Sequence, residues 1–357
     1  MNMRLLIVTQ KVDVNDAILG FFHHWLEKLA EKTELVVITN FLGRHNLPNN
    51  VEIYSLGKER NKGRWYKFFR YQYLFLKFLS KVNGIFFHMC PEYVIAVGLW
   101  PKIFRKKSIL WYVHVSVNWK LKLAERLVSK IFTASKGSFR LKSSKVIITG
   151  HGIDIEKFKI QNEFKNLNRK FNIIYVGRIS EIKNQKTLIK AIDILVNQNN
   201  FKNLKVDLIG NPITAKDQIY LKSLKNLIHE FNLEGYVNFL GSVPNKDIVK
   251  YYQEADLSIN LCPTGGLDKT VLESMACGLL IIIFNKNFLE ILKDYQDKLI
   301  LNNKNEKELT EKIIKIFELK REERKKISIF LRKQVIQYHN LNNLINKIIN
   351  EFQKIKS

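Results

Sequence analysis

Cysteine is scarce in this chain. Its 357 residues include three cysteines, Cys90, Cys262 and Cys277, which lie far apart in the sequence. So few and so widely spaced thiols exclude a disulfide framework and a paired zinc motif. We therefore expect a protein of a reducing compartment, the cytoplasm.

Long apolar runs are also missing. The apolar run within residues 1–9 is much shorter than that of a signal peptide, and Gln10 and Lys11 end it. No run reaches the ~18 uninterrupted apolar residues that a membrane span needs. We therefore read residues 4–9 as a buried strand, and we expect any membrane contact to be peripheral, at the inner face.

Acidic residues are few beside the basic ones. The chain carries 59 Lys and Arg against 33 Asp and Glu, a formal net charge of +26. This balance favours an anionic partner or surface. Part of it is background, because abundant Lys, Asn and Ile together are typical of an AT-rich coding sequence. The excess is densest at 58–145, where about twenty basic residues accompany only Glu59, Glu92 and Glu125.

Two cofactor motifs are absent. There is no Asp-x-Asp cluster to hold a metal against a diphosphate, and no Gly-x-Gly-x-x-Gly of a dinucleotide-binding turn. The sequence thus predicts neither a metal ion nor a bound cofactor.

The sequence does contain two series of apolar strands alternating with helical runs, which predicts parallel sheets covered on both faces. A chain of 357 residues exceeds what one core usually supports. The polar stretch 161–170 is the best linker, so we expect domains at 1–165 and 166–337. The expected strands of the two series are 4–9, 35–39, 51–55, 84–88, 108–114, 131–135 and 145–149, then 171–176, 204–209, 237–240, 257–261 and 280–284.

The remaining pattern is helical. In the first series the runs 19–31, 65–81 and 120–130 have helical spacing, and from Glu306 onward the whole pattern is helical. Near the C-terminus one apolar stripe is formed by Leu341, Leu344, Ile345, Ile348 and Ile349.

Two segments of the second series carry charge where a strand leads into a helix, which is where an α/β sheet binds anions. In the first, Val176–Lys183, the side chains of Arg178 and Lys183 can both face a diphosphate. In the second, 262–278, Glu273 supplies a carboxylate suited to a ribose diol. The alternatives are two solvated basic residues and a carboxylate stabilised by a helix dipole.

These segments resemble glycosyltransferase family 4, a large retaining group with the GT-B fold. The likeness includes the strand-Gly-Arg-x4-Lys element, the Gly-x-Val-Pro turn at 241–244 and the Glu-x2-Ala-x-Gly helix at 273–278. It extends to Gly20, His114 and the junction at 152–154 with Phe158. The resemblance implies an α/β fold of two Rossmann-like parallel-sheet domains facing each other across a cleft. It also implies a C-terminal helix, 338–357, that crosses back to the first domain.

The resemblance further implies the site. Catalytic residues would be His114, Arg178 and Lys183. Residues that bind the donor would be Gly20, Gly177, Arg178, Lys183, Val243, Gly266, Leu267, Asp268, Lys269, Thr270 and Glu273. From the residues alone, His114 is more readily interpreted as a structural histidine, and only the resemblance favours a role at the sugar. Gly20 is equally well a plain turn glycine.

One position departs from the family. The family often has two glutamates separated by seven residues, and Gly265 stands where the first would be. We hypothesise that Asp268 or Lys269 supplies polar contacts to the sugar instead.

The run 65–81 permits two interpretations. Its apolar residues Trp65, Phe68, Phe69, Leu76 and Leu79 can share one face, and its basic residues Lys67, Arg70, Lys77 and Lys81 another. Such a helix suits the surface of an anionic membrane, and it equally suits a core with a solvated basic face.

The function expected is a metal-independent, retaining hexosyltransferase. It would use a UDP- or GDP-linked sugar and a glycan or lipid-linked acceptor, in the synthesis of cell-envelope polysaccharide or glycolipid. One alternative is a nucleic-acid-binding α/β protein, for which Trp65, Tyr66 and Phe68 could stack on bases, although no nucleic-acid module is present. Another is a sugar-nucleotide epimerase with the same fold.

Overall fold

The computed structural model describes residues 3–161 and 169–354, which form two compact α/β units. Unit 1 comprises Met1–Gly152, Pro244–Lys246 and His339–Ser357, and unit 2 comprises Ile153–Val243 and Asp247–Tyr338. Residues 162–168 of the predicted linker lie outside the described part of the chain.

The sheet of unit 1 is entirely parallel, with strand order β3-β2-β1-β4-β5-β6-β7. All seven strands expected in this half are present. They are β1 (Arg4–Val12), β2 (Glu34–Leu42), β3 (Val51–Ser55), β4 (Gly84–His88), β5 (Lys107–Trp111), β6 (Lys130–Thr133) and β7 (Val146–Ile148).

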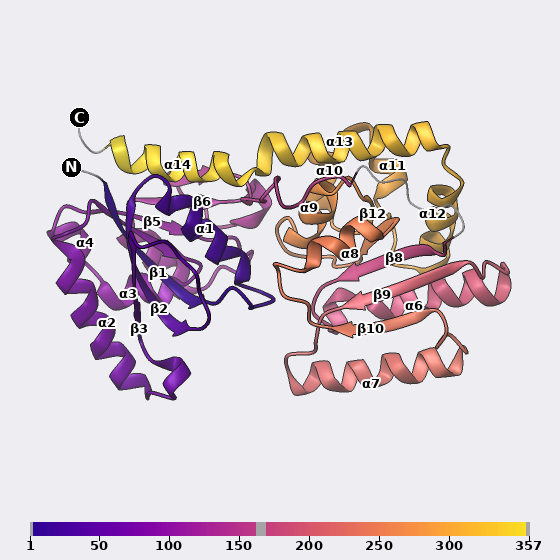
Figure 1. The fold of residues 1–357 in the computed structure, drawn as a ribbon, viewed down its shortest axis with the longest axis horizontal. Helices are drawn as coiled ribbons and strands as arrows, with labels where there is room; N and C mark the ends of the chain where they lie inside the picture. The colour runs from indigo at the N-terminus through magenta and orange to yellow at the C-terminus, as the bar shows by residue number, and fades with distance from the viewer. Residues whose placement is uncertain (1–2, 162–168, 355–357) are drawn as a thin grey trace. The chain divides into compact units, whose positions relative to one another are not determined.

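Helices cover both faces of this sheet because alternate side chains of each strand point to opposite faces. One face packs α1 (Gly20–Ala30) and α14 (Leu341–Gln353) against residues such as Leu5 and Ile7. The other packs α2 (Arg64–Leu79), α3 (Pro91–Val97) and α5 (Trp119–Leu127) against residues such as Leu6 and Val8. A short helix, α4 (Trp100–Ile103), precedes β5 (Figure 1).

One predicted strand is longer than the real one. Residues 108–114 were expected to form a strand ending at His114, but β5 ends at Trp111. Trp111 is the last residue of β5 that pairs with either neighbour, opposite His88 and Phe132. One further backbone hydrogen bond follows, from the Tyr112 N–H to the Phe132 carbonyl at 2.9 Å. His114 therefore lies in the loop that follows the carboxyl end of β5.

The C-terminal helix belongs to unit 1. The apolar residues Leu344, Ile345 and Ile348 of α14 are buried in the core shared with α1. Gly152, with φ of +69°, lies against this helix, and a Cβ there would stand 2.6 Å from Leu344 Cδ2 and 2.7 Å from Trp25 Cζ2. The Trp25 indole N–H donates to the Gly152 carbonyl at 3.2 Å. Only glycine fits this junction without displacing both neighbours.

Unit 2 has a five-stranded parallel sheet, order β10-β9-β8-β11-β12 (Figure 1). All five strands expected here are present: β8 (Phe171–Val176), β9 (Leu204–Ile209), β10 (Val237–Gly241), β11 (Leu257–Asn260) and β12 (Leu280–Ile283). Its helices are α6 (Gln185–Asp193), α7 (Ala215–Glu230), α8 (Ile248–Glu254), α9 (Lys269–Ala276), α10 (Leu289–Leu292), α11 (Gln296–Leu299), α12 (Glu306–Glu318) and α13 (Arg321–His339).

Arg332 of α13 binds the start of unit 2 to its core. Its guanidinium donates to the carbonyl oxygens of Phe158 at 2.7 Å, Ile155 at 3.1 Å and Ala276 at 2.5 Å. One planar fork thus satisfies carbonyls from two separate segments.

The cysteines and the helices agree with what the composition predicted. All three cysteines are buried, and none of them is joined to another in a disulfide. Among the described helices, none is both long enough and apolar enough to cross a membrane.

Candidate donor-binding site

Glycine lies at the carboxyl end of three adjacent strands of unit 2: Gly177 follows β8, Gly210 follows β9 and Gly241 is the last residue of β10. The Gly177 N–H donates to the Ile209 carbonyl at 2.9 Å, and the Gly210 N–H donates to the Gly241 carbonyl at 2.8 Å. Gly210 has φ of +141°, and a Cβ there would lie 2.1 Å from the Gly177 carbonyl oxygen. Gly210, which sequence reasoning missed, is therefore the glycine that the close approach of these strand ends requires.

Arg178 follows Gly177 at the carboxyl edge of the sheet. Its side chain is exposed, and its Nε lies 3.4 Å from the Ser180 hydroxyl. Its carbonyl accepts a hydrogen bond from the buried Gln185 amide at 3.0 Å. The turn is thereby fixed to the first residue of α6, while the guanidinium points to solvent where an anion can reach it.

Both the main-chain carbonyl and the side-chain ammonium of Lys183 have hydrogen-bond partners. The buried Tyr175 hydroxyl donates to the Lys183 carbonyl at 2.5 Å and accepts from the Leu261 N–H at 3.1 Å. The ammonium lies 2.5 Å from Asp268 Oδ2, with side chains 18% and 22% exposed. Burial, the largest single influence, lowers the pKa of Lys183, but the Asp268 carboxylate and the nearby Cys262 together outweigh burial, and the pKa is raised. Lys183 therefore carries its charge at neutral pH.

Through its contact with Lys183, Asp268 connects the two segments predicted to bind the donor, Val176–Lys183 and 262–278. Its Oδ2 also accepts from the Asn260 amide at 2.9 Å, and Asn260 Oδ1 accepts from the Cys262 N–H at 3.1 Å. The Thr270 hydroxyl lies 3.4 Å from Asp268 Oδ1. The structure thus brings Lys183, Asp268 and Thr270 together, and it adds Asn260, which carries no motif signal.

The loop before α9 is held by two side chains from the turn that follows β12. The Asn287 amide donates to the Gly265 carbonyl at 2.6 Å, and the Asn285 amide donates to the Gly266 carbonyl at 2.8 Å. Gly265 has φ of +117°, a backbone conformation that favours glycine. Leu267, the predicted site residue that follows Gly266, is buried, with 5% of its surface exposed. The two asparagines were not predicted, because they lie far along the chain from the loop they hold. Val243 is half-buried against the core of unit 2.

Glu273 lies in a buried charged cluster. It is 3% exposed and lies in the second turn of α9, so the dipole of the first turn does not account for its burial. The Tyr252 hydroxyl lies 3.4 Å from its Oε2, and the Lys269 ammonium lies 3.7 Å from its Oε1.

Two lysines face this carboxylate. Burial lowers the pKa of Lys269 to about 7, although the Glu273 charge opposes that shift. Burial also lowers the pKa of Lys157, again against the charge of Glu273. Two amino groups whose charged forms are disfavoured by burial thus face the Glu273 carboxylate.

Of the two predicted residues of unit 1, one begins a helix and the other lies in a loop. Gly20 is the first residue of α1, and its N–H donates to the Asp16 carbonyl at 3.1 Å. His114 is exposed, and its Nδ1 accepts from the Ser116 N–H at 3.1 Å. In the neutral imidazole the proton is therefore on Nε2, which is a hydrogen-bond donor.

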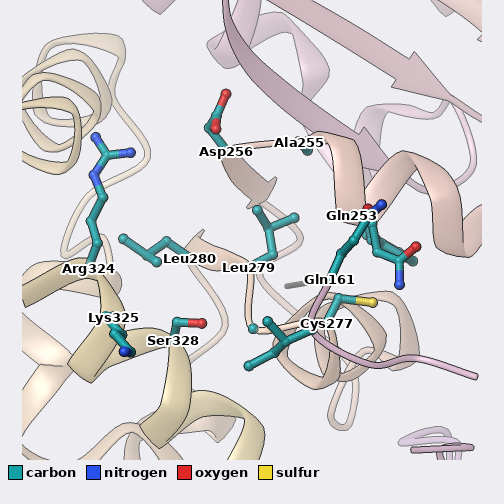
Figure 2. Close-up of a pocket in the computed structure, with 13 residues that line it drawn as sticks. Gln161, Gln253, Ala255, Asp256, Cys277, Leu279, Leu280, Arg324, Lys325 and Ser328 are labelled. Atoms are coloured by element: carbon teal, nitrogen blue, oxygen red, sulfur yellow. The ribbon is translucent and has the colours of Figure 1, made fainter. Parts of the chain in front are cut away.

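A separate cavity of about 250 Å³ lies in unit 2 (Figure 2). Its lining includes Asp256, Cys277, Arg324 and Ser328 and contains no predicted site residue. Within residues 3–161 and 169–354, no three His, Cys, Asp or Glu side chains are grouped as a metal ion would require.

Residues 156–334, half of the chain, match the profile of a family described as "Glycosyl transferases group 1". The chain belongs to the glycosyl transferases group 1 family. The matched range contains both the Lys183–Asp268 pair and Glu273, while Gly20 and His114 lie outside it.

Curated relatives match parts of this group 1 chain. A Campylobacter jejuni N,N'-diacetylbacillosaminyl-diphospho-undecaprenol alpha-1,3-N-acetylgalactosaminyltransferase is 29% identical over 194 residues, 50% of this chain and 46% of its own. A human GDP-Man:Man(3)GlcNAc(2)-PP-Dol alpha-1,2-mannosyltransferase is 26% identical over 116 residues, 32% of this chain and 24% of its own. The chain spans less than half the length of either relative.

Solved structures match the whole chain. Anabaena Alr3699/HepE in complex with UDP and glucose has a TM-score of 0.76 at 17% identity, covering 99% of this chain and 100% of that one. A glycosyltransferase from Rickettsia africae has a TM-score of 0.75 at 15% identity, covering 100% of both. The fold predicted from the sequence, an α/β GT-B fold with two parallel-sheet units, is confirmed.

Proposed function

We propose that this protein is a retaining glycosyltransferase that moves a hexose from a nucleotide-diphosphate sugar to a hydroxyl of an acceptor. One observation carries the proposal. Within the family-matched segment, Arg178 and a charged Lys183 lie on the same strand-to-helix turn of unit 2. Two cations beside a helix start suit a diphosphate better than any neutral ligand.

The proposed chemistry follows from where charge develops. Transfer breaks the bond between the anomeric carbon and the phosphate oxygen, so the leaving diphosphate gains negative charge while the sugar gains oxocarbenium character. Arg178 and Lys183 would stabilise that leaving group, and preorganised cations act most strongly on charge that appears in the transition state. With two cations in this role we propose that no metal ion is needed.

The remaining predicted residues take supporting roles. Glu273 would accept hydrogen bonds from the ribose hydroxyls. These bonds would replace part of its contact with Lys269. Gly177, Val243, Gly266, Leu267 and Thr270 would line the donor through backbone or short side chains. His114 would donate from Nε2 to a hydroxyl of the transferred sugar, and Gly20 would allow close approach of a ligand to the start of α1.

A lipid-linked glycan is the acceptor that we propose. The names of the Campylobacter jejuni and human relatives specify glycans linked to diphospho-undecaprenol and PP-Dol. An acceptor of that kind places the reaction in cell-envelope polysaccharide or glycolipid synthesis, at the inner face of a membrane.

Ligand-dependent thermal stability tests the donor. UDP, GDP, ADP and their sugars would be added separately, because a ligand that binds only the folded protein stabilises it by about 2.7 kcal/mol at a hundred times its Kd. We expect one base to raise the Tm, and the double substitution R178A/K183A to abolish that rise. No response to any nucleotide would refute the proposal.

Product analysis separates transfer from epimerisation. Transfer yields a new glycoside and a free nucleoside diphosphate in equal amounts. Consumption of donor without a glycoside, with an epimeric sugar released, would instead identify the epimerase alternative.

A further inference from the structure

The α2 helix buries only one of its two apolar faces. Its core side consists of Tyr71, Leu74, Phe75, Phe78 and Leu79, all at most 4% exposed. On the solvent side Trp65 is 73% exposed, Phe69 64% and Tyr73 63%. The expected apolar face was therefore wrong in one respect: Leu79 packs in the core, while the other four residues assigned with it face solvent.

The solvent side forms a continuous stripe. Residues 65, 69, 73 and 76 follow helical spacing, so their side chains line up along one side of α2. Trp65 and Phe69 lie 6.4 Å apart in a stacked arrangement, and Phe68 meets Phe69 edge-on at 5.5 Å. With Tyr66, these aromatics expose on the order of 500 Å², at the upper end of what a monomer normally leaves uncovered.

Basic residues border this stripe. The helix contains Arg64, Lys67, Arg70 and Lys77 and no acidic residue. Lys58, Arg60 and Lys62 precede it. The nearest acid in the sequence, Glu59, accepts a hydrogen bond from the Ser55 hydroxyl at 2.7 Å.

A second exposed apolar cluster adjoins α2. Around α4, Leu99 is 56% exposed, Ile103 65% and Phe104 42%, and Lys102 and Arg105 lie among them. Lys106, which follows α4, joins the segment just beyond the end of α2, because its ammonium donates to the Val82 carbonyl at 2.6 Å. We name the α2–α4 surface by its exposed apolar residues Trp65, Phe68, Phe69, Tyr73, Leu76, Leu99, Ile103 and Phe104.

We propose that the α2–α4 surface docks onto an anionic lipid bilayer. Apolar side chains at this surface would enter the boundary between headgroups and acyl chains, while the bordering Lys and Arg pair with lipid phosphates. Charge complementarity selects this occupant, because α2 combines exposed aromatic residues with four basic residues and has no acidic one. This proposal rests on the proposed lipid-linked acceptor, but it does not depend on which donor the protein uses.

The composition of the surface favours lipid over nucleic acid. Single-stranded nucleic acid needs flat rings on which bases stack. Leu76, Leu99 and Ile103 offer no such ring, and aliphatic residues beside Trp and Tyr are typical of an interface with acyl chains.

Vesicle sedimentation of the full chain tests the proposal. Vesicles of phosphatidylcholine alone would be compared with vesicles that also contain phosphatidylglycerol, at low and at high salt. We expect sedimentation with the anionic vesicles at low salt, a tenfold or greater loss of binding in W65S/F69S, and a similar loss in K62Q/R64Q at about fivefold per charge. Because these side chains are exposed, the Tm of both variants should match the parent.

A matched control removes exposed apolar groups elsewhere. Ile219 and Ile329 of unit 2 are 72% and 51% exposed, so I219S/I329S should sediment like the parent. Failure of the parent to bind anionic vesicles at low salt would overturn the proposal, as would equal losses in W65S/F69S and I219S/I329S. Displacement of the protein from vesicles by single-stranded DNA, with W65S/F69S losing DNA binding equally, would assign the surface to nucleic acid. The nucleotide response of the Tm is independent of all these outcomes.

Discussion

The contact between Lys183 and Asp268 allows a sharp test, because donor phosphate and Asp268 would compete for one ammonium. Substituting Asp268→Asn retains an oxygen that can accept from both Lys183 and Asn260 but removes the negative charge. The pair is mostly buried, at 18% and 22% exposure, so the charge matters more than at an open surface. We expect a loss of about 1–2 kcal/mol in the free energy of unfolding of the unliganded protein.

The same substitution should strengthen donor binding. A diphosphate beside Lys183 experiences repulsion from the Asp268 carboxylate, of about 1 kcal/mol across a few ångströms of partly solvated protein. Its removal predicts roughly fivefold tighter binding of the nucleoside diphosphate in titration calorimetry. Lys183→Met removes the cation itself and should weaken binding by roughly 10- to 100-fold.

A matched control lies on the same turn. Glu181 pairs with Lys216 at 2.7 Å, but their side chains are 59% and 75% exposed, so Glu181→Gln should change affinity less than twofold. If Asp268→Asn weakened nucleotide binding as much as Lys183→Met, Asp268 would contact the donor directly. If it behaved like Glu181→Gln, the reasoning from competition would be refuted.

Three further predictions concern stability. Gly210→Ala should cost about 2–5 kcal/mol in chemical denaturation, because its Cβ would overlap a carbonyl oxygen 2.1 Å away, while Gly235→Ala, with no atom within 4 Å, should stay within about 0.5 kcal/mol. Arg332→Lys should cost about 2–4 kcal/mol, since an ammonium cannot reach three carbonyls at once, and the exposed Lys333→Met should be neutral in the same assay. The folded pKa of Lys269, about 7, lies below the ordinary 10.5, so the unfolded chain binds more protons between these values and stability rises with pH there. Lys269→Met should flatten that rise in Tm from about pH 7 to about pH 10, and an unchanged slope would contradict it.

The strands were predictable because their signal is local. Runs such as Leu5–Val8 and Ile281–Ile283 are apolar throughout, which is typical of strands buried on both faces of a parallel sheet. Boundaries were harder to predict, as the end of β5 at Trp111 shows, because a strand stops where its neighbours stop and those neighbours are distant in sequence.

The donor-site motif was predictable only in part. Arg178 and Lys183 follow a strand within a few residues, so their common turn could be read from the sequence. The bond from Lys183 to Asp268 spans 85 residues, and Asn285 reaches back 19 residues to the Gly266 carbonyl. No local pattern encodes either contact, since both depend on how loops meet at the edge of the folded sheet.

The amphipathic run 65–81 shows the same limit. Its spacing predicted a helix, and α2 is one, but aromatic residues occur all round it and the sequence favoured no single face for the core. Packing against β2 and α3 decided which face is buried and left the other exposed.

By itself the sequence determined the strands, their parallel arrangement in two series and the place of Arg178 and Lys183 on one turn, because each depends on residues that are close neighbours in the chain. Only the tertiary structure decided that Asp268 holds Lys183, that Gly210 rather than Gly177 is sterically required, and that the aromatic stripe of α2 faces solvent. These outcomes depend on which distant segments come into contact, and a contact between distant segments is a property of packing rather than of local order.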